Sequence, residues 1–473
     1  MSIEILNLSL TDVSKKIIKK EISSEELVKL SIESSKKWNP IINAFIKINE
    51  DNAVTAARKA DQALSKGNPL GILHGIPLAH KDLFYLKGQP ITCGSKVLNG
   101  YVSEYDATVI DRLHNKAGAI NVGRLNMAEI AVGATGRNEH YGHCRNPWDP
   151  KVMTGGSSSG SGAAVAARNV FGSLGTDTGG SIRIPASACG LVGIKATYGR
   201  VSRYGVMPLS YSLDNAGPMA RTVEDCARLF KVIAGYDKFD SLTSTESVPD
   251  YEEIIKSADL RGKTIGIPKN YFFDNVEESI NASLQSALSI FKKLGVKIVE
   301  VEVTDQIVLR DMTNILLKAE VTNTHLEWLR DKPNEYQSEV RARLEAGLFV
   351  SAVDYLRAMR LRSKLTKNFV DLSLGNCDLL FTPSIPIEPP TLEEIDIAVQ
   401  QDALSINEKV PWCTRPLNYL GLPGISIPCG FTPKNIPIGF QLIGRPFSED
   451  LLFNFGHAYQ LETDWHTKPP VFN

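Results

Sequence analysis

The first 65 residues have the hydrophobic pattern of amphipathic helices. Ser23 and Glu26 have the spacing of a capping box, in which two side chains pair with backbone N–H groups at the start of a helix. Apolar residues then follow at near-helical spacing: Leu27, Leu30 and Ile32. We predict two or three helices between residues 9 and 65, and we treat residues 1–65 as an N-terminal helical segment.

Farther along the chain, short apolar runs alternate with helical stretches. The runs are IPLAHK (76–81), AINVG (119–123), LRGKTIGIP (260–268) and NCDLLFTPS (376–384). Strands that alternate with helices over such a length favour an α/β layered fold. Residues 275–372 are mostly helical in pattern, rich in Lys, Arg and Glu, and poor in glycine. We predict that this segment is an insertion or cap on the α/β core.

Composition narrows the class of protein. The chain has 473 residues, of which 43% are hydrophobic and 22% charged, values that are ordinary for a globular protein. Its formal net charge of −1 provides no basic field for nucleic acid or anionic lipid. No apolar run approaches the roughly 20 residues that span a bilayer, and no basic region precedes the first apolar residues. We expect no nucleic-acid partner, no membrane and no signal peptide.

The cysteines favour a reducing compartment. They are scattered, odd in number and never spaced as Cys-x-x-Cys, so a disulfide framework or a structural zinc site is not expected. No His, Asp, Glu or Cys cluster has the spacing of metal ligands. We predict reduced, mostly buried thiols, a cytoplasmic location, and no metal or other cofactor. The seven cysteines are Cys93, Cys144, Cys189, Cys226, Cys377, Cys413 and Cys429.

A glycine- and serine-rich stretch, residues 154–190, contains two Gly-Gly-Ser triplets. Three interpretations compete: a flexible linker, a phosphate-binding loop and a serine-based catalytic centre. The apolar run AAVAARNVF argues against a linker, because it is suited to a packed helix. A P-loop requires Gly-x4-Gly-Lys, and no lysine follows here. Phosphate binding by residues 155–162 therefore stays a distant alternative.

A catalytic serine requires a base that takes its proton. No histidine lies in the glycine-rich stretch. A lysine can replace histidine when burial keeps it neutral, and Ser-Lys pairs are an attested variant of the catalytic triad. Lys81 ends the apolar run IPLAHK and is a candidate. From the pattern alone, however, a single lysine is more often a solvated charge.

The motifs together resemble those of the amidase signature family. GGSSSGSGAAVAA (155–167) and GTDTGGSIRIPA (175–186) are similar to its central signature, and GIPLAHKDLF (75–84) is similar to its lysine motif. The resemblance extends over roughly residues 10–465. It implies a single large α/β domain over residues 66–473, with a central mixed, twisted β-sheet covered by helices. A variable, mostly helical, cap-like insertion is expected at about 245–410.

The resemblance also implies a catalytic triad. Ser181 corresponds to the nucleophile that forms an acyl-enzyme. Ser157 corresponds to the serine that lies between the nucleophile and the base, beside a cis peptide bond. Lys81 corresponds to the base, which must be neutral to accept a proton. By the same resemblance, backbone N–H groups of the second triplet form the oxyanion hole: those of Thr178, Gly179, Gly180 and Ser181.

Other expectations concern the supports of the site and the substrate. We interpret Asp177 and Arg183 as structural supports of the turn that carries Ser181. Met127 corresponds to a position that lines the acyl pocket in relatives, although a packed core methionine is an equal alternative. Gly155 and Gly156 are expected to contact substrate.

The predicted function is hydrolysis of a carboxylic amide to a carboxylate and ammonia or an amine. We favour a stand-alone amidase, because KVPWCTRPLNYLGLPGISIPCGF (409–431) resembles free-standing members of the family. The alternative is the glutamine-hydrolysing component of a tRNA-dependent amidotransferase. A small-molecule amide is the expected partner, and a homodimer is left open.

Overall fold

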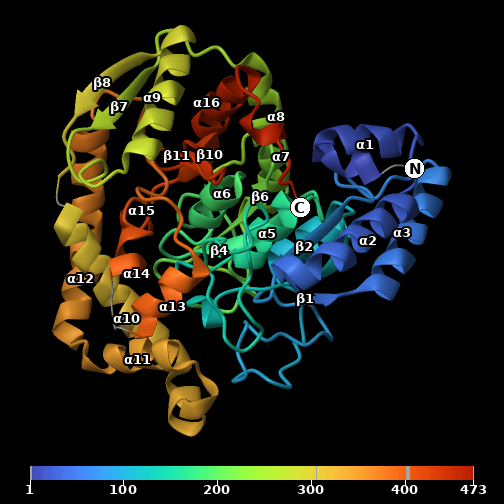
Figure 1. The fold of residues 1–473 in the computed structure, drawn as a ribbon, viewed down its shortest axis with the longest axis horizontal. Helices are drawn as coiled ribbons and strands as arrows, with labels where there is room; N and C mark the ends of the chain where they lie inside the picture. Colours follow the sequence, from blue (N-terminus) through green and yellow to red (C-terminus); the bar gives the residue numbers. More distant parts are fainter. Residues whose placement is uncertain (1–2, 305, 401–404, 472–473) are drawn as a thin grey trace.

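Two β-sheets organise the protein in the computed structural model, which describes residues 3–304, 306–400 and 405–471 (Figure 1). The strands of the larger sheet, in the order β4-β6-β5-β10-β11-β9-β7-β8, are β4 (Gly172–Asp177), β5 (Val192–Lys195), β6 (Asn215–Ala220), β7 (Thr264–Pro268), β8 (Lys297–Val301), β9 (Leu379–Pro383), β10 (Gly424–Phe431) and β11 (Pro437–Ile443). The smaller sheet, in the order β1-β3-β2, contains β1 (Phe45–Ile48), β2 (Pro77–Lys81) and β3 (Ile120–Leu125).

Both sheets are mixed. β7 pairs in parallel with β8 and β9, whereas β10 pairs antiparallel with β5 and β11. In the smaller sheet, β2 is parallel to β3 and β1 is antiparallel to it. The predicted α/β fold with a mixed central sheet is confirmed.

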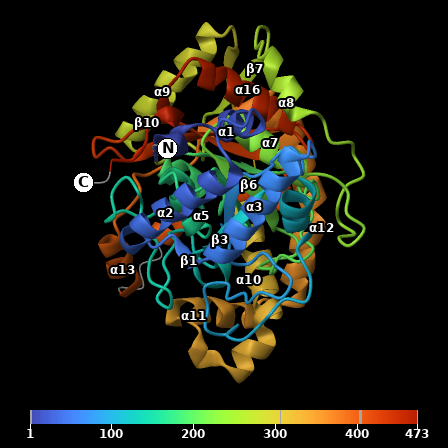
Figure 2. The same ribbon diagram turned by 90° about the vertical axis from the view of Figure 1, so that its right-hand side faces the viewer.

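Helices cover the sheets. They are α1 (Leu10–Ile18), α2 (Ser24–Ile42), α3 (Glu50–Ser65), α4 (Thr108–Ile110), α5 (Ser159–Ala166), α6 (Arg183–Cys189), α7 (Val223–Ile233), α8 (Tyr251–Ile254), α9 (Glu278–Lys293), α10 (Gln306–Asp331), α11 (Ser338–Ala346), α12 (Ala352–Asn368), α13 (Leu392–Gln400), α14 (Ser405–Lys409), α15 (Pro416–Leu420) and α16 (Glu449–Leu461). Figures 1 and 2 place α2 and α3 at one end, beside the smaller sheet, and α10, α11 and α12 on the opposite side.

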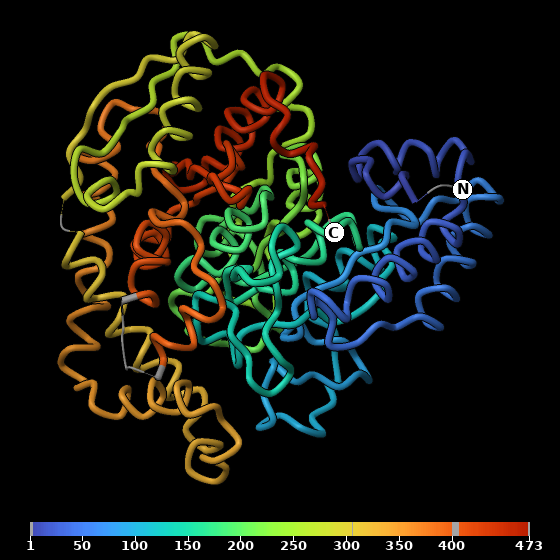
Figure 3. Tube along the Cα trace, viewed as in Figure 1, coloured from blue at the N-terminus to red at the C-terminus, as the bar shows by residue number. Residues whose placement is uncertain are grey.

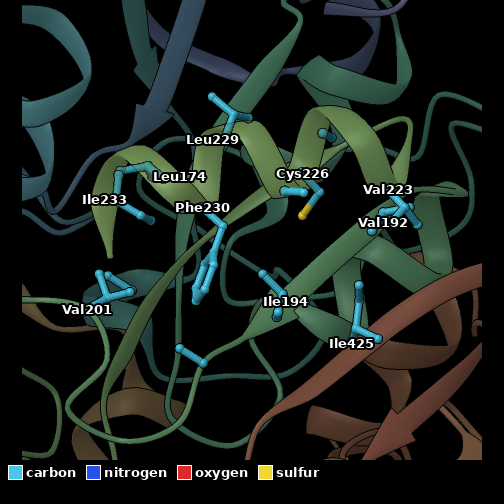
Figure 4. Packing of buried hydrophobic residues seen from close by; sticks show 14 of the residues in the cluster. Leu174, Val192, Ile194, Val201, Val223, Cys226, Leu229, Phe230, Ile233 and Ile425 are labelled. Carbon is cyan, nitrogen blue, oxygen red and sulfur yellow. The ribbon is translucent and has the colours of Figure 1, made fainter. Parts of the chain in front are cut away.

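The main core lies between α7 and the larger sheet. Figure 4 shows Phe230 and Cys226 of α7 directed toward Ile194 of β5, with Leu174 of β4 and Ile425 of β10 nearby. All five side chains are essentially inaccessible to solvent. Burial of a large apolar side chain stabilises the folded state by about 1.5–3 kcal/mol. This packing holds β4, which carries the second Gly-Gly-Ser triplet at its end.

The predicted helix start at Ser23 is confirmed. Its hydroxyl accepts a hydrogen bond from the N–H of Glu26 at 3.1 Å, and the Glu26 carboxylate accepts one from the N–H of Ser23 at 3.0 Å. The predicted strands at 76–81, 119–123, 260–268 and 376–384 are also present, as β2, β3, β7 and β9.

The structure differs from the sequence-based picture in two segments. Residues 1–65 contain β1 as well as three α-helices, and β1 belongs to the smaller sheet. Residues 245–410 contain β7, β8 and β9, which are part of the larger sheet (Figure 3). β8 was missed because it is a short, half-exposed edge strand whose charged residues interrupt the apolar pattern.

In the ranges that the structure describes, no helix combines the length and the hydropathy needed to cross a membrane.

Candidate active site

Lys81 lies at the C-terminal end of β2, in the interior of the protein. All five residues of β2 are buried, and the Lys81 side chain is 1% exposed. Its Nζ forms hydrogen bonds with Ser157 Oγ at 2.7 Å and with Thr176 Oγ1 at 2.8 Å. The structure therefore brings together the lysine and the serine that the sequence analysis paired.

Burial changes the acidity of this lysine. Removal from solvent lowers the pKa of Lys81 to about 7, although the carboxylates of Asp214 and Asp177 favour its charged form. Above pH 7 most of the amine is neutral, and a neutral amine has a lone pair that can accept a proton. Lys81 thus has both the contact and the pKa of a general base for Ser157.

The first Gly-Gly-Ser turn is packed against backbone. A Cβ on Gly156 would lie 2.5 Å from the N of Gly136 and 2.9 Å from the O of Gly133, so only glycine fits. The Gly156–Ser157 peptide bond is cis, as the resemblance implied. The carbonyl of Ser157 accepts a hydrogen bond from the N–H of Ala128 at 3.1 Å. These contacts place a fully buried Ser157 against Lys81.

The second Gly-Gly-Ser turn winds around a buried carboxylate. Asp177 Oδ1 accepts a hydrogen bond from the N–H of Gly180 at 2.8 Å, and Oδ2 accepts one from the N–H of Ile182 at 3.2 Å. Arg183 binds both oxygens of Asp177, at 3.0 and 2.8 Å. Burial raises the pKa of Asp177, but the charge and hydrogen bonds of Arg183 outweigh it and bring the pKa to about 2. Asp177 and Arg183 therefore support this turn, as predicted.

Three of the four predicted oxyanion donors are available. Within the described part of the chain, the N–H groups of Thr178, Gly179 and Ser181 have no hydrogen-bond partner. Gly180 differs from the prediction, because its N–H is already paired with Asp177. Gly179 and Ser181 are half-exposed, whereas all other residues of 171–189 are buried. Ser181 thus lies at an opening with unpaired donors beside it.

Three functional contacts were not identified from the sequence. Thr176 hydrogen-bonds Lys81, and Asp214 accepts a 2.5 Å hydrogen bond from the Thr178 hydroxyl. Asn418 donates to the backbone carbonyl of Asp177 at 2.8 Å. Strand alternation could have shown that Thr176 faces away from Asp177. No local signal connects Asn418 with this turn, since 241 residues separate it from Asp177.

The predicted substrate contacts lie close to the triad but are enclosed. Met127 is fully buried in the main core, and Gly155 and Gly156 are buried beneath the first turn. Their contact with substrate stays a prediction. Residues 155–162 are buried throughout, so this loop has no exposed surface that could receive a phosphate. Among the described residues, no group of three His, Cys, Asp or Glu side chains could hold a metal ion.

Known proteins share this sequence and fold. A family model described as Amidase matches residues 26–453. The chain is 39% identical over 475 residues to the A-type subunit of the glutamyl-tRNA(Gln) amidotransferase from Coxiella burnetii, covering 95% of this chain and 96% of that protein.

Two solved structures show the same fold. One comes from a vestigial protein complex that reveals the evolutionary origins of an s-triazine catabolic enzyme; the TM-score is 0.89 at 30% identity, covering 96% of this chain and 98% of that one. The other is the peptide amidase of Stenotrophomonas maltophilia, with a TM-score of 0.84 at 27% identity over 98% of each chain. The family model and these end-to-end relatives agree with the geometry, and the chain belongs to the amidase signature family of hydrolases.

Proposed function

We propose that the protein is a stand-alone amidase that hydrolyses a carboxylic amide through an acyl-enzyme on Ser181. The observation that carries the proposal is the 2.7 Å contact between Lys81 Nζ and Ser157 Oγ in a fully buried site. There, burial lowers the pKa of the lysine to about 7. A buried lysine that contacts a serine hydroxyl and carries little charge above pH 7 is suited to proton transfer.

In the proposed reaction, Ser181 Oγ attacks the amide carbonyl carbon. Its proton passes to Ser157, while the proton of Ser157 passes to neutral Lys81. The N–H groups of Thr178, Gly179 and Ser181 stabilise the negative oxygen that develops, and one such donor contributes about 2.7–4 kcal/mol. A proton returns through Ser157 to the leaving nitrogen, which departs as ammonia or an amine. Water then attacks the ester by the same relay and releases the carboxylate.

Covalent labelling tests this assignment. We expect a serine-directed fluorophosphonate to modify wild-type protein at Ser181, as located by peptide mass spectrometry, because its hydroxyl is activated and accessible. Ser181→Ala should not be labelled, whereas Ser244→Ala, a control in a loop far along the chain, should be labelled as wild type is. Label on another serine in wild-type protein would contradict the assignment of the nucleophile.

A second candidate function is glutamine hydrolysis within an amidotransferase. The 39% identity to the Coxiella burnetii protein over nearly the whole chain supports it. The similarity to the peptide amidase and the resemblance of residues 409–431 to free-standing amidases support the stand-alone alternative. The purified chain should be incubated separately with glutamine and with simple alkyl and aryl amides, and the released ammonia and amine measured. Turnover of simple amides supports the stand-alone enzyme; turnover of glutamine alone supports the second candidate.

A further inference from the structure

The loop before α15 lies against the turn that carries Ser181. The hydroxyl of Thr414 donates a hydrogen bond to the carbonyl of Gly179 at 2.9 Å. The next side chain, Arg415, covers the same glycine: a Cβ on Gly179 would lie 3.8 Å from Arg415 Cγ and 3.9 Å from its Nε. Two residues span at most about 7 Å, so the Arg415 side chain borders the opening at Ser181. Figure 1 shows α14 and α15 beside α10 on this side of the molecule.

The positive charge of Arg415 has no acidic partner. Its guanidinium contacts Asn314 Oδ1 at 3.2 Å and the carbonyl of Asn407 at 3.4 Å. In the described ranges it forms no salt bridge, unlike Arg310, which pairs with Asp311, and Arg343, which pairs with Glu339. Burial lowers the pKa of Arg415. A largely buried charge without a partner is costly, and an arriving anion would relieve that cost.

Arg415 lines a small pocket that is richer in positive than in negative groups. The other residues of its lining are Tyr271, Arg310, Glu408, Pro411 and Trp412. Glu408 is exposed and, in the described ranges, forms no salt bridge to either arginine. The rings of Tyr271 and Trp412 are stacked 4.6 Å apart and form a rigid wall. A planar guanidinium fork beside such a wall matches the geometry of a carboxylate.

We propose that Arg415 binds a carboxylate on the acyl part of the substrate, so that the preferred substrates are amides that carry a carboxylate a few bonds from the amide carbonyl. The inference rests on the proposed function, because it places the amide carbonyl at Ser181. The short distance across Gly179 favours the monoamides of small dicarboxylic acids over long-chain or neutral amides.

The test compares pairs of substrates that differ only in charge. For glutaramate and pentanamide, kcat/KM should be measured with wild-type protein and with Arg415→Gln. We expect wild type to prefer glutaramate, and Arg415→Gln to lower the ratio of the two kcat/KM values about 100-fold, as expected when one partner of a buried charge pair is removed. Arg415→Lys should recover part of the ratio, because it restores the charge but not the fork. Arg330→Gln, on an exposed arginine of α10, is the control that should leave the ratio unchanged.

Equal losses on both substrates would mean that Arg415 only supports the turn, and would overturn the inference. So would a wild-type enzyme that shows no preference for glutaramate. A second measurement is independent of turnover: glutarate should raise the melting temperature of Ser181→Ala protein but not that of the Ser181→Ala, Arg415→Gln double variant. Glutarate binding without any amide turnover would contradict the proposed function and not the anion site. Amide turnover that is insensitive to Arg415→Gln would contradict the anion site alone.

Discussion

The two Gly-Gly-Ser turns have the same sequence and different surroundings. The turn at 155–157 is buried on all sides, and backbone atoms of residues 133 and 136 occupy the space beside Gly156. The turn at 179–181 faces an opening, and the nearest atoms to a Gly179 Cβ belong to the Arg415 side chain, 3.8 Å away. One glycine is therefore required by packing, whereas the other has room for a methyl group.

This difference separates two tasks. The closed turn keeps Ser157 in contact with a lysine that must stay away from water to remain neutral. The open turn presents Ser181 together with N–H donors that are unpaired within the described residues. Identical tripeptides thus supply a proton relay in one place and a nucleophile in the other, because the surrounding elements decide which groups are covered.

The largest effect is expected at the open turn. Ser181→Ala removes the proposed nucleophile and should lower kcat/KM on an amide by on the order of 10⁴-fold or more. Its melting temperature should match that of wild type, since Ser181 is half-exposed and its hydroxyl has no hydrogen-bond partner in the described residues. A variant that keeps most of its activity would assign the nucleophile elsewhere.

The next effect is expected at the closed turn, through Lys81. Wild-type kcat/KM should rise with pH through about pH 7, because protonated Lys81 cannot accept the proton of Ser157 and deprotonated Lys81 can. Lys81→Ala should lose about 10³-fold in activity and the rising limb with it. Lys81→Arg should not rescue either, because a guanidinium stays protonated.

The substrate leaving group sharpens the Lys81 experiment. An alkoxide leaving group depends less on a delivered proton than an amine does, so a matched ester should lose less activity than the amide in Lys81→Ala. A pH profile of Lys81→Ala that keeps the same rising limb would show that another group is the base.

Packing distinguishes the two turns in a third experiment. Gly156→Ala brings a methyl group to within 2.5 Å of the Gly136 nitrogen, where backbone must move. We expect it to destabilise the protein by about 3 kcal/mol or more in urea unfolding, since overpacking of a rigid site typically costs this much. A Gly156→Ala protein as stable as wild type would contradict the closed description of this turn.

The matched change in the open turn should have the smallest effect. Gly179→Ala meets nothing closer than 3.8 Å and requires no unusual backbone angle. We expect unfolding in urea at the wild-type midpoint and a kcat/KM within about fivefold of wild type, because the added methyl contacts Arg415 without displacing it. Loss of stability equal to that of Gly156→Ala would mean that the two turns are equally constrained.

The sequence by itself determined the elements and the reacting groups. Periodicity predicted the capping box at Ser23 and the strand that ends at Lys81, because hydrophobic spacing reports local backbone geometry. The signature motifs placed Lys81, Ser157 and Ser181 in one site before any distance was known. Such features are encoded within a few residues of each other.

Only the tertiary structure decided which distant groups complete the site. Asn418 reaches Asp177 across 241 residues, and Arg415 covers Gly179 from the loop before α15. The same holds for the Asp177 carboxylate that occupies the Gly180 N–H. These contacts depend on how the strands and helices are ordered and packed, so no local pattern records them. Sequence motifs therefore identified the chemistry, and the packing of remote segments decided which donors are free and which charge borders the nucleophile.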